Sequence, residues 1–207
     1  MLTFWQHGYE TSSVADLTAA MGITTPSLYT AFGDKKQLFL EAVRLYAGAP
    51  EAMTEAVASA PSARAAARDL MHAAACAYTG EATPRGCLLA SATATGSASA
   101  VDVQRAVADV RRHVQGALQA RIERDVSEQT LPPETDAAAL AGMVMAVMQG
   151  MSVLARDGSD RAALLSITGA ALTAWPRPSG PSTDEREDAA GPQSLLRPAG
   201  HTRREPV

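Results

Sequence analysis

Aromatic side chains, cysteines and lysines are scarce in this chain. Aromatic residues make up only 4% of its 207 positions, and there are two cysteines, Cys76 and Cys87, and two lysines. The two cysteines form neither a Cys-x-x-Cys pair nor the disulfide framework of a small secreted domain. The 15 glycines are scattered without a period, which excludes a collagen-like protein.

Signals for membrane insertion and secretion are also missing. We find no apolar run that approaches the ~20 residues needed for a membrane-spanning helix. The first residues, Met1 to Trp5, lack the basic flank and the apolar stretch of a signal peptide. We therefore expect a soluble, cytoplasmic protein with no membrane partner, large enough for one or two domains with a real core.

Acidic residues outnumber basic ones, with 22 Asp and Glu against 18 Lys and Arg. A protein that holds nucleic acid by bulk electrostatics is usually basic. Any contact with nucleic acid is therefore expected to come from a local, shaped element.

Composition divides the chain into three zones. Residues 1–48 hold most of the aromatics and both lysines, and residues 49–175 are rich in alanine and show helical periodicity. Residues 176–207 carry six of the twelve prolines and almost no large apolar residues. This last zone cannot bury enough surface to offset its ordering entropy, so we predict a disordered tail.

The pattern along the chain predicts an all-α protein, because strand signals are absent throughout. In the middle zone we expect helices over residues 63–78 and 101–126. After the break at Pro132-Pro133, Thr135 or Asp136 can cap a helix running to about residue 156. Asp160 can cap a last helix that stops at Trp175-Pro176. The low-complexity stretch 91–100 is interpreted as a helix end followed by a loop.

Residues 12–22 have the features of a short, well-defined helix. Ser13 and Asp16 have the spacing of a capping box. Leu17 and its neighbours at helical spacing form an apolar face. Gly22 then occupies the place where a left-handed residue ends a helix.

A second helix is expected directly afterwards, which gives a helix-turn-helix. Thr24 can cap it, and Leu28 and Phe32 face inward together. The opposite side is small and polar, as suits a helix lying in a major groove roughly 12 Å wide. The hydroxyls suited to phosphate and non-stringent base contacts are those of Thr25, Ser27, Tyr29 and Thr30. No Arg, Asn or Gln lies on this side, so we expect sequence preference to rest partly on DNA shape.

The only two lysines lie at the start of the next helix. Asp34 is the expected N-cap, and Lys35 and Lys36 in the first turn oppose the helix dipole. A phosphate held by the exposed N–H groups and Lys35 would explain this placement. The alternative is two solvated lysines, and the preceding helix favours the phosphate.

These residues resemble the DNA-binding domain of the TetR/AcrR family of bacterial transcriptional regulators. The pattern is Gly8-Tyr9-x-x-Ser12-Ser13-Val14-x-x-Leu17, then Gly22-Ile23-Thr24-x-Pro26-Ser27-Leu28-Tyr29-x-x-Phe32-x-x-Lys35-x-x-Leu38. The resemblance implies a homodimer, a palindromic double-stranded DNA operator, and repression relieved by a small ligand. By motif position the DNA contacts are Thr24, Thr25, Pro26, Ser27, Tyr29 and Lys35, to which the helical wheel adds Thr30. The segment Arg85-Gly86-Cys87-Leu88-Leu89 resembles one subgroup of the family.

The chain departs from the family pattern at two places. Ala31 stands where many relatives carry His or Tyr, so one phosphate contact is lost. The first helix is expected to be truncated, with the true start upstream of Met1. On this hypothesis Phe4 and Trp5 lack the turns that would cover them, and a basic arm is missing. The alternative function is therefore a dimeric small-molecule-binding protein that no longer binds DNA.

The middle zone offers a possible pocket for an apolar ligand. Met71, Cys87, Met148 and Met151 are the candidate lining residues, since thioethers adapt to irregular apolar ligands. Packing in the core or at a dimer interface is the favoured interpretation for any single methionine. For Cys87, a buried structural thiol is favoured over a sensor of oxidants or electrophiles.

Catalytic and metal-binding patterns give no support to an enzyme. His72 and Cys76 lie four residues apart, but two ligands do not make a zinc site. His113 lies among arginines on a solvated face. The chain has no Gly-x-Ser-x-Gly, no His-Glu-x-x-His and no phosphate-binding glycine loop. We therefore predict no catalytic residue, no metal and no cofactor.

Overall fold

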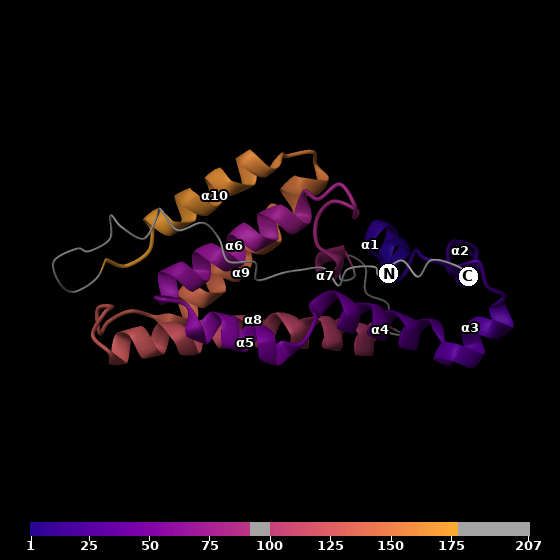
Figure 1. Ribbon diagram of the computed structural model, residues 1–207, viewed down its shortest axis with the longest axis horizontal. Helices are drawn as coiled ribbons and strands as arrows, with labels where there is room; N and C mark the ends of the chain where they lie inside the picture. The colour runs from indigo at the N-terminus through magenta and orange to yellow at the C-terminus, as the bar shows by residue number, and fades with distance from the viewer. Residues whose placement is uncertain (92–99, 178–207) are drawn as a thin grey trace, which may run out of the picture.

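The computed structural model describes residues 1–91 and 100–177. Over these residues every regular element is a helix, as predicted, and none is a strand. The tail from residue 178 onward and most of the low-complexity stretch lie outside the described residues. The helices are α1 Leu2–His7, α2 Val14–Met21, α3 Thr25–Phe32, α4 Lys35–Ala47, α5 Pro50–Ser59, α6 Ala63–Tyr78, α7 Leu88–Ser91, α8 Val101–Ser127, α9 Ala137–Arg156 and α10 Arg161–Thr173 (Figure 1).

The molecule is elongated, with α1, α2 and α3 gathered at one end (Figure 1). α4 leads away from them, and α5 continues in the same direction beside the long helix α8. α6, α9 and α10 pack against one another in a second group, and α6 and α9 also contact α8. One continuous hydrophobic core runs through both groups.

Helix caps account for most of the boundaries that the sequence predicts. Ser13 and Asp16 form the complete capping box of α2, and Asp34 accepts a hydrogen bond from the Gln37 amide at 2.7 Å. Of the two candidates for α9 the cap is Asp136, and Asp160 caps α10 as expected. α10 ends at Thr173, two residues before Trp175, which is buried.

The prediction that no apolar stretch is long enough to cross a membrane is wrong for α9. Over the described residues this one helix has the length and composition of a membrane span. Its residues Val144, Met148 and Met151 pack in the core, and α6, α8 and α10 all contact it. A central helix in a bundle of helices meets the same criterion of length and composition.

The expectation that Phe4 and Trp5 lack cover is also wrong. Phe4 is 0% and Trp5 4% exposed. The ring of Phe4 meets that of Phe39 edge-on at 5.1 Å between centroids, and Trp5 meets Tyr46 in the same way at 5.0 Å. Both covering rings belong to α4, so α4 supplies the contacts that upstream turns were expected to make.

A buried ion pair fixes the junction between α5, α6 and α8. Arg121 donates a hydrogen bond to Asp125 one turn along α8, and both side chains are nearly inaccessible to solvent. The Arg121 guanidinium also donates to the carbonyls of Ala60 and Pro61, each at 3.1 Å. Asp125 accepts a hydrogen bond from the Ala63 amide at 2.7 Å, so it satisfies a free N–H at the start of α6.

Because removal of one partner leaves the other charge buried and unpaired, Asp125→Ala is expected to lower the free energy of unfolding by about 3–5 kcal/mol. Urea denaturation followed by circular dichroism measures this change. Asp109→Ala, which breaks the exposed pair with Arg112 on the same helix, is the matched control. It is expected to cost less than about 1 kcal/mol. Equal losses in the two variants would contradict a special role for the buried pair.

Candidate nucleic-acid interface

α2, the turn at Gly22 and α3 form a helix-turn-helix at the end of the molecule (Figure 1). Gly22 has φ 65° and ψ 30°, the left-handed conformation that the sequence requires there. Leu17 of α2 and Leu28 of α3 are buried, while Phe32 packs against the same core with part of its surface exposed. These contacts fix which side of α3 faces outward.

The outward side of α3 carries all the predicted contacts on this helix. Tyr29 is 47% exposed, the largest side chain on this surface. The Thr24 hydroxyl caps the helix and lies 2.9 Å from the Ser27 hydroxyl. The Thr30 hydroxyl donates to the Pro26 carbonyl at 2.9 Å, so its oxygen can still accept a hydrogen bond. The exposed residues are Thr24, Thr25, Pro26, Ser27, Tyr29 and Thr30.

The two lysines at the start of α4 have different surroundings. Lys35 Nζ lies 4.6 Å from the centre of the Tyr9 ring and donates to the Glu10 carbonyl at 3.3 Å. Its partial burial lowers the pKa of the ammonium group, opposed by the nearby Glu10 charge. Lys36 instead forms an ion pair with Asp102 of α8 at 3.1 Å. Lys36 is therefore not simply solvated.

Sequence reasoning missed the contacts that join this helix-turn-helix to the rest of the molecule. The indole N–H of Trp5 donates to the Gly86 carbonyl at 3.0 Å, and Arg156 at the end of α9 donates to the Trp5 carbonyl at 2.8 Å. In the sequence, Arg85 and Gly86 are indicated only by a family resemblance. Nothing in the spacing of Arg156 indicated a partner 151 residues away.

The four candidate pocket residues are all buried in the core, and none of them lines the open pocket of the structure. Met71 and Met151 are 0% exposed, Cys87 4% and Met148 9%. The Tyr46 hydroxyl donates to Cys87 Sγ at 3.3 Å, and the Cys87 amide donates to the Ser152 hydroxyl at 2.8 Å. Burial, with Cys87 next in effect, raises the pKa of Tyr46, so this hydroxyl keeps its proton.

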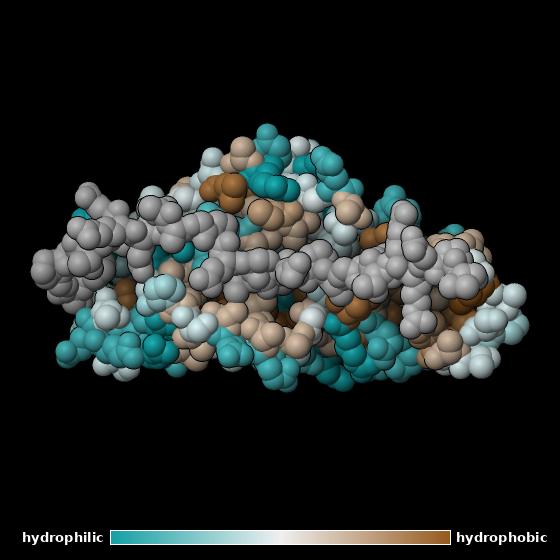
Figure 2. All heavy atoms as spheres, in the orientation of Figure 1, coloured by the Kyte–Doolittle hydropathy of each residue, from teal (hydrophilic) through white to brown (hydrophobic). Residues whose placement is uncertain are grey.

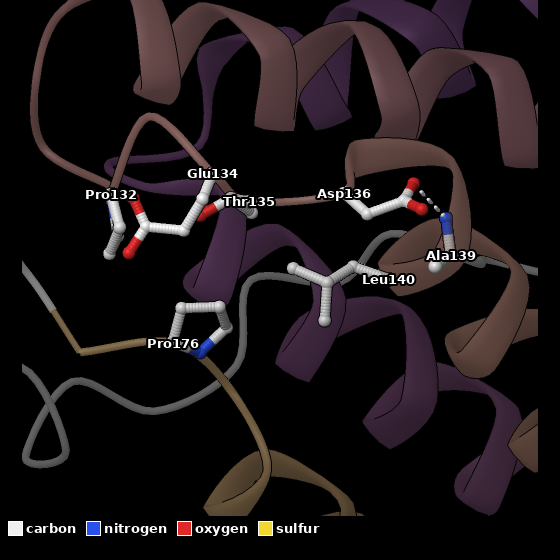
Figure 3. A pocket seen from close by; sticks show the side chains of 7 residues that line it. All are labelled: Pro132, Glu134, Thr135, Asp136, Ala139, Leu140 and Pro176. Atoms are coloured by element: carbon white, nitrogen blue, oxygen red, sulfur yellow. Dashed lines mark hydrogen bonds between the residues drawn. The ribbon is translucent and has the colours of Figure 1, made fainter.

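An open pocket of about 310 Å³ is found elsewhere, at the N-terminal end of α9 (Figure 3). It lies at the end of the molecule opposite α3 (Figure 1). Asp136 faces this pocket but already accepts the capping hydrogen bond of Ala139 at 2.9 Å. The residues that line the pocket are Pro132, Glu134, Thr135, Asp136, Ala139, Leu140 and Pro176. The candidate residues Met71, Cys87, Met148 and Met151 do not line it.

The comparison with known proteins covers both parts of the chain. The family model described as bacterial regulatory proteins, tetR family, matches residues 3–42. The model described as tetracyclin repressor-like, C-terminal domain, matches residues 64–168. The HTH-type transcriptional repressor ComR of Escherichia coli (strain K12) is 33% identical over 178 residues, which cover 85% of this chain and 85% of ComR.

Solved structures agree with these matches. A cysteine mutant of the TetR family transcriptional regulator CifR, complexed with 26-bp double-strand operator DNA, is 37% identical with a TM-score of 0.78. The match covers 84% of this chain and 92% of that one. A putative TetR transcriptional regulator from Rhodococcus sp. RHA1 is 33% identical, with a TM-score of 0.59 and coverage of 84% and 93%. The chain described here belongs to the TetR family and is a DNA-binding transcriptional regulator.

Proposed function

We propose that this regulator is a homodimeric repressor that binds a palindromic DNA operator and releases it when a small apolar ligand binds. The exposed outer side of α3, held in place by buried Leu28, is the observation that carries the proposal. ComR and CifR support it, the first as a named repressor and the second by its complex with operator DNA. These relatives favour DNA binding over the alternative of a protein that binds only small molecules.

In this proposal α3 lies in the major groove and the start of α4 meets the DNA backbone. Thr24, Thr25, Pro26, Ser27, Tyr29 and Thr30 supply hydroxyl and apolar contacts to base edges and phosphates. Lys35 faces a phosphate together with the free N–H groups of the first turn of α4. Its contacts with the Tyr9 ring and the Glu10 carbonyl hold the ammonium in one place before DNA arrives.

The dimer interface is proposed on the outer faces of α9 and α10. Neither helix has a charged residue between Ala137 and Ala155 or between Ala162 and Ala174. Val153 is 56% and Leu154 39% exposed. Figure 2 shows hydrophobic side chains in the region of α10, beside hydrophilic ones. Two such helices from each protomer would pack as a four-helix bundle around a two-fold axis, covering apolar faces that are otherwise exposed to water.

The ligand site is proposed within the core around α6 and α9, to which Met71, Cys87, Met148 and Met151 belong. Since these side chains are buried, ligand entry requires the two helices to separate. The flexible thioethers of the methionines lower the cost of such repacking. The apolar side chains of the three methionines favour an apolar ligand. We further propose a cytoplasmic location, as expected for a protein that acts on DNA.

The direct test is a fluorescence anisotropy titration of the purified chain against duplexes that flank its own gene, at two salt concentrations. We expect one duplex to bind tightly and the logarithm of the association constant to fall linearly with the logarithm of salt. DNase footprinting of that duplex should protect two symmetric half-sites. If the protein binds none of the flanking duplexes, the operator does not lie beside its own gene.

Two substitutions on the predicted DNA-binding face should weaken operator binding without changing the dimer. Tyr29→Ala is expected to reduce affinity about tenfold through loss of hydrogen bonds to the backbone. Lys35→Ala should also reduce the salt slope by about one for each protomer. Arg44→Ala is the matched control for Lys35→Ala, because it removes an exposed positive charge from the same helix, α4. Unaltered affinity in both Tyr29→Ala and Lys35→Ala would contradict the docking face.

A charge placed on the exposed stripe of α9 should dissociate the dimer. Leu154→Glu is expected to give a monomer in light scattering, because a carboxylate cannot be buried there without a partner. Binding to the palindromic operator should fall at least tenfold in the same variant. Leu45→Glu, at an exposed position on α4, serves as the control and should leave the mass unchanged. A Leu154→Glu variant that remains dimeric would place the interface elsewhere.

A bulkier side chain in the proposed ligand site should block ligand entry but not DNA binding. The apolar dye anilinonaphthalene sulfonate is the probe, and its fluorescence is measured with the folded dimer. We expect Met148→Trp to lose at least half of the dye signal and to keep its operator affinity. Met53→Trp, on α5, is the control for adding an indole ring. Equal dye signals in Met148→Trp and wild type would exclude this site.

A further inference from the structure

We propose that Arg156 is a positioning residue that sets the orientation of the helix-turn-helix relative to α9, and with it the spacing of half-sites that the dimer accepts. Arg156 lies at the C-terminal end of α9, whose outer face is the proposed dimer interface. Its guanidinium donates to the Trp5 carbonyl of α1 at 2.8 Å and to the Ser91 hydroxyl of α7. The inference rests on the proposed function, because it assumes two half-sites bound by a dimer.

The loop of residues 85–87 forms the middle layer of this junction. On one side it is bonded to α9: Arg85 Nε donates to the Ala155 carbonyl at 2.7 Å, and the Cys87 amide donates to the Ser152 hydroxyl at 2.8 Å. On the other side, the Gly86 carbonyl accepts the indole N–H of Trp5 at 3.0 Å. The loop therefore joins α9 directly to α1.

Gly86 shows how closely these layers approach one another. Its φ is 83°, a conformation that favours glycine. A Cβ at this position would lie 2.8 Å from the Ser152 carbonyl oxygen and 2.8 Å from Arg156 Nε. The aliphatic stem of Arg156 therefore packs on the loop while its guanidinium reaches past it to α1. A junction with so little free space transmits a displacement of α9 rather than absorbing it.

From α1 the contact continues into the DNA-binding helices. Trp5 packs edge-on against Tyr46, and its neighbour Phe4 packs against Phe39, both on α4. α4 in turn contacts α3. A shift or rotation of the end of α9 thus reaches α3 through buried, rigid aromatic rings.

A second polar contact, between α4 and α8 at the surface, is weaker than the contacts of Arg156. Lys36 and Asp102 lie 3.1 Å apart, with side chains 34% and 57% exposed. Such exposed pairs contribute little and break easily. Arg156 makes two hydrogen bonds to two elements of the junction, and one of its partners is a main-chain carbonyl that cannot change rotamer. Orientation is therefore expected to depend on Arg156 rather than on Lys36.

The test compares operator duplexes that differ by one base pair in the spacer between half-sites. One inserted pair moves a half-site by about 3.4 Å and rotates it by roughly 35°. The wild-type dimer is expected to lose at least tenfold in affinity on the altered spacers. Arg156→Met keeps the stem over Gly86 but removes both hydrogen bonds. It should bind the native spacer less tightly and discriminate less than threefold between spacers.

The matched control is Arg161→Met. Arg161 lies at the start of α10 and donates a hydrogen bond to Thr79, away from the helix-turn-helix. The Arg161→Met variant should keep the wild-type discrimination. Light scattering and thermal unfolding show whether each variant is a folded dimer. If Arg156→Met does not dimerise, Arg156→Gln replaces it, since its polar side chain is too short to reach the Trp5 carbonyl and the Ser91 hydroxyl.

The possible outcomes separate the two proposals. Weak discrimination by a folded, dimeric Arg156→Met or Arg156→Gln, with normal discrimination by Arg161→Met, supports the positioning role. Wild-type discrimination in a folded, dimeric Arg156 variant would overturn it. If the wild-type protein binds none of the spacers, the operator assignment itself fails, and the result counts against the proposed function.

Discussion

The burial of Trp5 between α4 and the loop at Gly86 is the contact on which the arrangement of the molecule depends. Its ring is covered by Tyr46, its indole N–H is bonded to Gly86 and its carbonyl to Arg156. Trp5 thus contributes to the core of the DNA-binding end and also attaches that end to the loop at Gly86. Buried polar groups need partners, so the indole N–H fixes the loop in one position and limits the orientations open to α1.

Polar contacts in this fold divide by burial into two kinds with different consequences. Arg121 and Asp125 are enclosed by α5, α6 and α8, where their charges must remain paired and where each also satisfies main-chain groups. Lys36 and Asp102 meet at the surface, where water competes for both charges. The buried Arg121–Asp125 pair holds α5, α6 and α8 together. The exposed Lys36–Asp102 pair contributes little, so the orientation of the DNA-binding end depends on the junction at Trp5.

The apolar character of α9 serves two surfaces at once. One side, with Val144 and Met151, completes the core, and the other leaves Val153 and Leu154 exposed. A helix that is apolar on both sides is typical of a membrane span or of a helix buried between two bodies. In the proposed homodimer, a second copy of the chain covers the outer side.

Sequence alone determined the helix-turn-helix, because its caps, its left-handed Gly22 and its inward Leu28 depend on contacts within a few residues. It also determined which α3 side chains face outward. Only the tertiary structure decided that α4 covers Phe4 and Trp5, that Lys35 lies over Tyr9, and that all four candidate pocket residues are buried. These contacts join residues far apart in the chain. Local periodicity fixes which face of a helix is buried, but carries no information on which distant helix will cover it.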